Sequence, residues 1–354
     1  MNLQFEISNS KSAADGIRVR GVGAVSPAGW GMESLRLALD KAEALAMREL
    51  ARPGWSRPLR VRRVPSPAHR PECFGHPRLR RSSPISQYAV AAALEALGDD
   101  APKVSGGSMR LGIVFCVMSG CVNYSRRFYD EAWRDPATAS PLIFAETVFN
   151  APSSHLASLL GTTAINYTLV GDPGTFLQGL ALAAEWFSAG LVDGCLVVGS
   201  EEMDWLTADA FRLFTRRLVM SEGAGALYLR RESGRQPGVK LAAVTDAHLF
   251  TNRPGRERAA CLAAAQLGST GSADLLCDGL LGIPILDRAE TAAWNDWKGS
   301  RVSPKRILGE GLMAASAWQC VVAIDLLARK RCQAGLVSVA GCNQQAIGAR
   351  FEAG

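Results

Sequence analysis

The chain has 354 residues, and a hydrophobic content of 48% is ample for the core of one large α/β unit or of two fused ones. Charged residues make up only 20% and glycine is frequent at 35 residues, which argues against a disordered chain and against a coiled coil. The net charge of +6 is modest but unevenly distributed.

The sequence has the features of neither a membrane protein nor a secreted one. Even the apolar stretch 177–192 is interrupted by Gln178 and Glu185, which excludes a membrane span there. The first residues, MNLQFEISNSKSAADG, lack the positive region and apolar run of a secretory signal. The nine cysteines show no CxxC pair and no Cys/His ligand spacing, so we expect no disulfide, no metal site and no cofactor. We expect the protein in the cytoplasm.

Alternating and periodic patterns define the first elements of the chain. We expect residues 1–15 to be flexible, and the alternation in IRVRGVGAVS predicts a strand. After a break at Pro27 and two glycines, MESLRLALDKAEALAMREL predicts an amphipathic helix. A later segment, ISQYAVAAALEALG, predicts a second helix, and RLGIVFCVMSG is apolar throughout, as in a buried strand of a parallel sheet.

A β-turn-α-β unit follows a polar and aromatic segment at residues 122–150. INYTLV predicts a strand, GDPGTF a sharp turn, LQGLALAAEWFSAG a helix of small residues, and DGCLVVGSEE another buried strand. A small-residue helix followed by an apolar strand recurs around residues 311–341. This recurrence predicts two related halves, which we place at residues 16–235 and at a shortened 236–354.

An Arg- and Pro-rich segment at residues 48–81 carries ten arginines against two glutamates. It is either a solvated loop or a docking face for an acidic partner. We expect no nucleic-acid partner, because no binding motif or aromatic platform accompanies the arginines. The candidate partner-binding residues are Arg60, Arg62, Arg63, Arg80 and Arg81.

Three stretches of the sequence resemble the β-ketoacyl synthase family. VRGVGAVSPAGWGMESLRLAL resembles the family's first strand and glycine turn. DGCLVVGSEE, together with SEGAGALYLRRE, resembles the strands that close its first half, and SPKRILGEGLMAAS resembles its late Ser-x-Lys loop and the following helix. The resemblance implies an α/β, thiolase-like fold, in which two similar halves form five layers, αβαβα, and which normally works as a dimer.

The resemblance also implies a nucleophilic cysteine at the N-terminus of a buried central helix, where the helix stabilises a thiolate. Counting back along the predicted helix places that position on or beside Pro173, and no cysteine lies between Cys121 and Cys195. Asp172 and Pro173 are typical of a helix start, with Asp172 as the N-cap and Pro173 at the first helical position. The nucleophile is therefore replaced by a capping sequence.

Two histidines of the second half are missing as well. In active members they stabilise the enolate that forms when a malonyl group loses carbon dioxide. The corresponding positions here hold Asp278, in the run DGLLG, and Glu310. Lys305 is retained, and we expect a buried carboxylate partner for it, either Glu310 or Asp278. The gating phenylalanine of the family's C-terminal glycine turn is absent from AGCNQQAIG.

None of the positions Asp172, Pro173, Asp278, Lys305 and Glu310 is assigned a catalytic role with confidence. The sequence is identified as a non-condensing relative of the synthases that resembles chain-length factors of type II fatty-acid or polyketide systems. Such a subunit pairs with an active ketosynthase, and an acyl carrier protein is the expected second partner. This hypothesis is wrong if Cys121 or Cys342 lies at the mouth of the central helix with His248 beside it.

Two alternatives remain open at this stage. One is an enzyme of the same fold with altered decarboxylase or acyltransferase chemistry, in which Asp172, Glu310 or Lys305 acts as the acid, base or electrostatic group. The other is a scaffold that docks acyl carrier protein through the basic segment and has no acyl tunnel.

Overall fold

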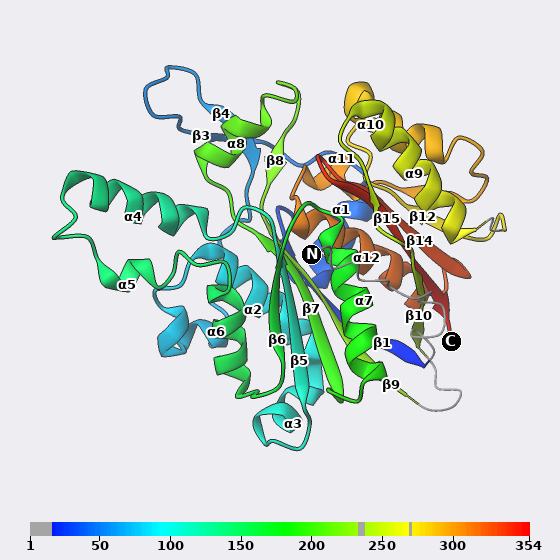
Figure 1. Cartoon of the computed structure of the whole chain (residues 1–354), viewed down its shortest axis with the longest axis horizontal. Helices are drawn as coiled ribbons and strands as arrows, with labels where there is room; N and C mark the ends of the chain where they lie inside the picture. The colour runs from blue at the N-terminus through cyan, green and yellow to red at the C-terminus, as the bar shows by residue number, and fades with distance from the viewer. Residues whose placement is uncertain (1–15, 233–237, 269–270) are drawn as a thin grey trace, which may run out of the picture.

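The structure of the chain is a computed structural model that describes residues 16–232, 238–268 and 271–354. The expected flexible segment 1–15 and the expected boundary between residues 235 and 236 lie outside the described residues. The described residues form one large sheet of twelve strands, ten of them in the order β13-β12-β14-β15-β10-β1-β9-β7-β5-β6 (Figure 1), with the short strands β2 and β11 paired to β1 and β15. β10 joins β1 through two antiparallel residue pairs, so this junction divides the sheet into two sets of five strands.

The two sets repeat one topology. The strands of the first are β1 (Ile17–Ser26), β5 (Leu111–Val117), β6 (Asn166–Val170), β7 (Gly194–Glu201) and β9 (Gly223–Arg231). The strands of the second are β10 (Val239–Val244), β12 (Leu275–Cys277), β13 (Ser300–Val302), β14 (Ala334–Ala340) and β15 (Gln345–Ala353). In each set the spatial order is third, second, fourth, fifth, first, with the same parallel and antiparallel pairings. The expectation of two similar halves is confirmed.

Helices complete five layers. The central layer contains α7 (Thr175–Ser188) and α12 (Met313–Ala328), and α12 contacts strands of both halves. The outer face of the first half is covered by α2 (Pro84–Leu97) and α6 (Ala151–Leu160). The outer face of the second half is covered by α9 (Arg253–Leu267) and α10 (Pro284–Ala293) (Figure 1). The predicted αβαβα arrangement is therefore confirmed.

The central helix α12 is tied to both halves by polar side chains. Trp318 donates its indole N–H to the carbonyls of Val25 (3.1 Å) and Ala224 (2.9 Å) in the first half. Gln319 donates to the carbonyl of Ser338 (2.8 Å) in the second. Gly225, in the SEGAGA stretch, allows α12 to lie this close, because a Cβ there would come within 2.7 Å of the Ala317 Cβ.

The first predicted helix is shorter than expected. α1 (Met32–Lys41) ends at Ala42, whose φ of 53° is left-handed, and the expected continuation to Leu50 is wrong. The last three residues of that stretch form β3 (Arg48–Leu50), which pairs with β4 (Leu59–Arg62). Pairing with a neighbouring strand therefore overrides the helical pattern of this stretch.

The remaining elements are short or lie at the periphery. They are β2 (Gly29–Trp30), η1 (Glu72–Gly75), η2 (Pro77–Leu79), η3 (Gly98–Asp100), α3 (Ala101–Ser105), α4 (Val122–Arg134), α5 (Pro141–Phe144), α8 (Trp205–Phe211), β8 (Met220–Ser221), β11 (His248–Leu249) and α11 (Pro304–Leu308). α4 and α5 project away from the body of the molecule (Figure 1). Within the described residues, none of the helices has the length and apolarity needed to cross a membrane.

Candidate functional site

Asp172 fixes the start of the central helix α7, but by a different geometry from the predicted cap. The helix begins at Thr175, and Gly174 is its N-cap residue. One Asp172 carboxylate oxygen accepts the N–H of Gly174 at 3.1 Å. The other accepts the N–H groups of Gln344 and Gln345 at 3.1 and 3.2 Å. Asp172 therefore joins the start of α7 to the turn between β14 and β15 instead of capping one helix, and its carboxylate is buried.

The turn leaves no room for a side chain at Gly341. A Cβ at this position would overlap the carboxylate of Asp172 and come within 2.7 Å of the carbonyl of Gln345. A glycine is therefore required for Asp172 to reach the turn.

Lys305 and Glu310 form a buried ion pair. Lys305 Nζ lies 2.8 Å from Glu310 Oε2, and the two side chains are 6% and 10% exposed. Glu310 Oε1 also accepts the N–H of Leu312 at 2.8 Å, at the start of α12. Burial lowers the pKa of Lys305, but the charge and the hydrogen bond of Glu310 outweigh burial and leave the pKa raised. Glu310 is thus the carboxylate partner of the lysine.

Asp278 is buried and faces a different cation. Its side chain forms an ion pair with Arg301 at 2.5 Å and accepts the N–H of Leu280 at 3.0 Å. Beside it, Glu290 accepts the N–H of Gly279 at 3.1 Å. Burial and the neighbouring charge of Asp278 raise the pKa of Glu290, and Lys305 acts in the opposite direction. Both carboxylates are held by the protein and do not point into open space.

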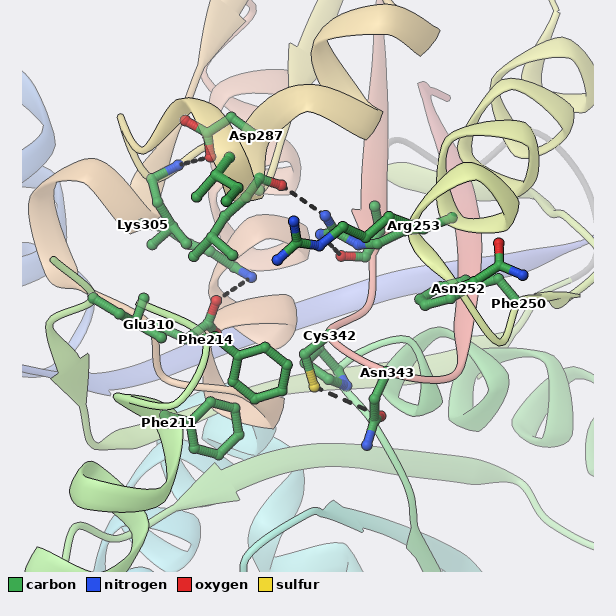
Figure 2. Close-up of a pocket in the computed structure, with 18 of the residues that line it drawn as sticks. Phe211, Phe214, Phe250, Asn252, Arg253, Asp287, Lys305, Glu310, Cys342 and Asn343 are labelled. Atoms are coloured by element: carbon green, nitrogen blue, oxygen red, sulfur yellow. Dashed lines mark hydrogen bonds and ion pairs between the residues drawn. The ribbon is translucent and has the colours of Figure 1, made fainter. Parts of the chain in front are cut away.

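The predicted positions converge on one pocket of about 300 Å³, which is lined by Pro173, Lys305 and Glu310 (Figure 2). Asp172 and Asp278 are buried behind its lining. Figure 2 shows Phe211 and Phe214 beside Glu310, and Arg253 and Asn252 on the opposite side of the pocket. The remaining lining residues are Leu218, Phe250, Thr251, Arg256, Gly279, Leu281, Ile285, Leu286, Asp287, Ala340, Cys342 and Asn343.

Cys342 lies in this pocket, in the turn that Asp172 binds. Burial, together with the charges of Asp172 and Glu310, raises the pKa of its thiol to about 12. His248 is not a lining residue and lies 3.2 Å from Gln266 on α9. Cys121 is buried at the base of α4, away from the pocket lining, and burial raises the pKa of its thiol. Among the described residues, then, the pocket contains a protonated thiol without an imidazole beside it.

Comparisons with known proteins reveal the fold but no close sequence relative. No protein-family model matches the chain, and no curated protein does so significantly. Among solved structures, the ishigamide ketosynthase/chain length factor matches with a TM-score of 0.76 and 18% identity, over 96% of this chain and 99% of that one. A β-ketoacyl synthase from Burkholderia phymatum matches with the same TM-score and 17% identity, over 96% and 99%.

A third structure, a ketosynthase in complex with its chain length factor from Xenorhabdus doucetiae, also has a TM-score of 0.76. Its identity to this chain is 16%, over 96% of this chain and 98% of that one. The chain has the ketosynthase fold. Because these matches extend over nearly the full length of both chains, the thiolase-like fold expected from the sequence is confirmed.

The basic segment of this ketosynthase fold is only partly available to a partner. Arg60, Arg80 and Arg81 are exposed. Arg62 is buried, donates to the carbonyl of Leu45 at 2.8 Å, and has a pKa lowered by burial. Arg63 lies 3.2 Å from Glu222. The candidate docking face is therefore reduced to the three exposed arginines.

Acidic residues at the end of β7 and just after it bind the base of α4 and the turn before it, a role that sequence reasoning missed. Glu202 accepts the N–H of Asn123 at 2.8 Å, and Asp204 forms an ion pair with Arg126 at 2.8 Å. Glu201 accepts the N–H groups of Met118 and Ser119 at 2.6 and 3.0 Å, in the turn that leads to α4. The motif SEEMD offered a signal, because buried carboxylates need donors.

Glu201 makes the stability of this region depend on pH. Burial raises its pKa from about 4.5 to about 8, despite the N–H groups that favour the carboxylate. The unfolded chain releases this proton near pH 4.5 and the folded protein only near pH 8, so the contribution of Glu201 falls as pH rises through this range. We expect Glu201→Gln to lack this pH-dependent loss of stability. Above pH 8, its free energy of unfolding should therefore be higher than that of the wild type.

Urea unfolding at pH 6, 7.5 and 9 measures this difference. Glu43→Gln is the control, because Glu43 is exposed and the substitution removes the same charge. Parallel pH profiles of the wild type and Glu201→Gln would show that Glu201 does not cause the loss.

Proposed function

We propose that the chain is a non-condensing subunit that pairs with an active ketosynthase, as a chain-length factor does. The observation that carries this proposal is the pocket at the start of α7. Pro173, on or beside which the resemblance predicts the nucleophile position, lines this pocket, and Lys305 and Glu310 form an ion pair on its wall. Cys342, the one cysteine among the described residues that line the pocket, has a thiol whose pKa is raised by burial to about 12, so it is protonated at neutral pH. A thioester intermediate needs a thiolate, and an enolate needs donors that are free to bind it.

The edge strand β6 supports pairing with a second chain. Among the residues that the structure describes, β6 is the last strand of the sheet and pairs with β5 on one side only. The carbonyl of Ile165 and the N–H of Gly171 point to β5, so the odd-numbered residues face β5. The even-numbered residues, Thr168 among them, therefore present backbone N–H and C=O groups to the open edge. Such an edge is a template for another strand.

Exposed apolar residues on α4 and α5 support the same partner. α4 has no buried residue, and Tyr129 and Trp133 stack on its surface with ring centroids 6.1 Å apart, at exposures of 63% and 79%. On α5, Leu142 and Phe144 are 67% and 55% exposed. An apolar helix face of this kind needs a cover. A ketosynthase is the favoured occupant, because the matched structures include a ketosynthase in complex with its chain length factor.

An acyl carrier protein is the proposed second partner. Arg60, Arg80 and Arg81 are exposed cations, which suit an acidic protein. One of the matched solved structures is a complex of a type II acyl-carrier protein with its ketosynthase. Salt-dependent binding that weakens when the three arginines are replaced by glutamine would support this part of the proposal.

Co-expression with each intact ketosynthase of the source organism tests the proposal. We expect one ketosynthase to co-purify with the chain in equal amounts, and we expect the chain alone to form no condensed product from acyl- and malonyl-carrier protein. Condensed product from the chain alone would refute the non-condensing role. Carbon dioxide release from malonyl-carrier protein by the chain alone would favour the decarboxylase alternative, and a stable homodimer that excludes every ketosynthase would refute the heterodimer.

A further inference from the structure

Two loops at one end of the molecule carry apolar side chains that are exposed to solvent. The β3–β4 loop (residues 51–58) and the α8–β8 loop (residues 212–219) both project from the end that also carries α10 (Figure 1). Trp55 in the first loop is 64% exposed, and Leu213 and Phe214 in the second are 90% and 45% exposed. Leu213 is the most exposed large hydrophobic residue among those that the structure describes. Apolar side chains grouped on projecting loops mark an interaction site.

The α8–β8 loop begins with a hydrogen-bonded turn. The N–H of Leu213 donates to the carbonyl of Ala210, and the N–H of Phe214 donates to the carbonyl of Phe211, both at 3.1 Å. The rings of Phe211 and Phe214 stack with their centroids 5.6 Å apart. The turn therefore holds Leu213 in solvent, where it can contact a partner without a rearrangement of the loop.

The β3–β4 loop is fixed beside α8. Arg52 forms an ion pair with Asp209 of α8 at 2.6 Å and lies 3.8 Å from the centre of the Trp55 ring. Both loops also rest on one small hydrophobic core, which contains Leu59 directly after the first loop and Leu218 in the second. The apolar side chains of the two loops therefore belong to one surface.

The same surface is basic. The two loops contain no carboxylate and five arginines, which are Arg52, Arg57, Arg212, Arg216 and Arg217. Asp209 offsets part of this charge, because it binds Arg52 and lies 3.9 Å from Arg212. The other three arginines are exposed, and none of the described carboxylates forms an ion pair with them. The surface therefore favours an anionic partner.

Carboxylates of the adjoining elements do not remove this excess of positive charge. Four of them bind cations outside the two loops: Asp204 with Arg126, Glu222 with Arg63, Glu310 with Lys305, and Glu257 with Arg288. On the strands next to the β3–β4 loop, Glu49 lies opposite Arg60. In the stretch that leads to β3, Glu43 stands between Lys41 and Arg48. The arginines of the two loops are thus left to an external anion.

We infer that this surface docks the protein peripherally on a membrane that contains anionic phospholipids. Tryptophan and leucine enter the boundary between headgroups and acyl chains, and arginine remains at the level of the phosphates. Trp55 and Leu213 suit the apolar side of that boundary, and the exposed arginines beside them suit the phosphates. A fluid lipid surface accepts separate loop tips, whereas a protein partner needs a shaped hollow for each of them. The surface shares no residue with β6, α4 or α5, so its role does not depend on pairing with a ketosynthase.

Docking through these loops places the pocket beside the lipid. Phe211, Phe214 and Leu218 of this region line the pocket at the start of α7. Phe214 is also 45% exposed, so the pocket lining continues onto the docking surface. On a bound membrane, the pocket therefore lies next to the boundary into which apolar ligands partition.

Sedimentation of the full-length protein with lipid vesicles tests the docking surface. We expect binding to phosphatidylcholine vesicles that contain one quarter phosphatidylglycerol, and weaker binding to pure phosphatidylcholine, with salt dependence on the anionic vesicles only. Trp55→Ser with Leu213→Ser should weaken binding to the anionic vesicles at least about tenfold, because both apolar tips are lost. Arg216→Gln with Arg217→Gln should weaken it at least about tenfold and leave binding to pure phosphatidylcholine unchanged.

Two pairs of exposed residues outside the loops are the matched controls. Leu37→Ser with Leu191→Ser removes two leucines that are 57% and 48% exposed, and Lys330→Gln with Arg331→Gln removes two exposed cations. Both control pairs should bind vesicles as the wild type does. Absence of wild-type binding to the anionic vesicles would refute the docking surface, as would an equal loss in the control pairs. Leu213-dependent binding to an acyl carrier protein of the source organism, without binding to vesicles, would overturn the lipid assignment in favour of an acidic protein.

Discussion

Glu310→Gln is expected to lower the free energy of unfolding at pH 7 by about 3 to 5 kcal/mol, although the substitution keeps the shape of the side chain. Glu310 lies 2.8 Å from a lysine that is only 6% exposed. The amide keeps an oxygen for the N–H of Leu312, so the main loss is the negative charge beside Lys305. A buried ammonium without a counter-charge is one of the largest single penalties in a protein core.

A second substitution separates loss of charge from loss of shape. Lys305→Met in the Glu310→Gln background removes the uncompensated ammonium, so the double variant should be more stable than Glu310→Gln alone. Urea unfolding of the two single variants and the double variant gives the coupling energy. A double variant no more stable than Glu310→Gln would show that the two side chains do not form an energetically coupled pair.

The pH dependence of the same variants provides an independent check. In the wild type, the pKa of Lys305 is raised, so its contribution to stability is present below pH 10.5 and is lost above the folded-state pKa. Without Glu310, burial lowers the pKa of Lys305 below 10.5, so the folded variant loses the buried charge as pH rises toward 10. The difference in free energy of unfolding between the wild type and Glu310→Gln should therefore become smaller over this range. A deficit that is constant with pH would point to loss of shape instead of loss of charge.

The sequence predicted the architecture because the architecture depends on local patterns. The small-residue helices and apolar strands near residues 176–199 and 311–341 recur in the structure as α7 with β7 and α12 with β14. The stretch SEGAGA was informative for a packing reason, since Gly225 lies against Ala317 of the central helix. The helices and strands follow from the pattern of neighbouring residues. The close approach of the central helix to the sheet is indicated by a glycine in the sequence.

Features that depend on distant contacts were not predictable. The helix expected to reach Leu50 ends at Lys41, because residues 48–50 pair with β4. Asp172 was expected to cap one helix, yet one of its oxygens binds N–H groups more than 170 residues away. The choice of Glu310 over Asp278 as the partner of Lys305 likewise depended on Arg301, which binds Asp278.

The pocket and the outer edge of β6 differ in whether their polar groups have hydrogen-bond partners. At the pocket, Asp172, Asp278 and Glu310 each have donors from the protein itself. A group that is already neutralised or hydrogen-bonded has little left to give to a transition state. At β6, by contrast, the backbone groups of the even-numbered residues face an edge at which the described residues supply no further strand. The two regions therefore differ: the three carboxylates of the pocket accept from donors of the chain, and the backbone groups on the outer side of β6 have no strand partner among the described residues.

Thr168→Pro is expected to weaken association with the partner ketosynthase at least about tenfold while the chain stays folded. Thr168 is at the centre of β6, and its N–H faces the open edge because the odd-numbered residues face β5. Proline removes that donor and adds bulk at the edge without removing a hydrogen bond to β5. Pull-down of the co-expressed ketosynthase, with binding measured on the purified pair, determines the effect.

Thr168→Val is the control that separates loss of the side-chain hydroxyl from loss of the backbone N–H. Thr168 Oγ1 lies 3.2 Å from Ser153 Oγ on α6, so both substitutions lose this contact, but only proline loses the backbone N–H. We expect Thr168→Val to bind the partner nearly as the wild type does. If valine weakens pairing as much as proline, the hydroxyl contact and not the strand edge is responsible. If neither substitution has an effect, pairing through β6 is wrong and the exposed faces of α4 and α5 remain as the docking surface to test.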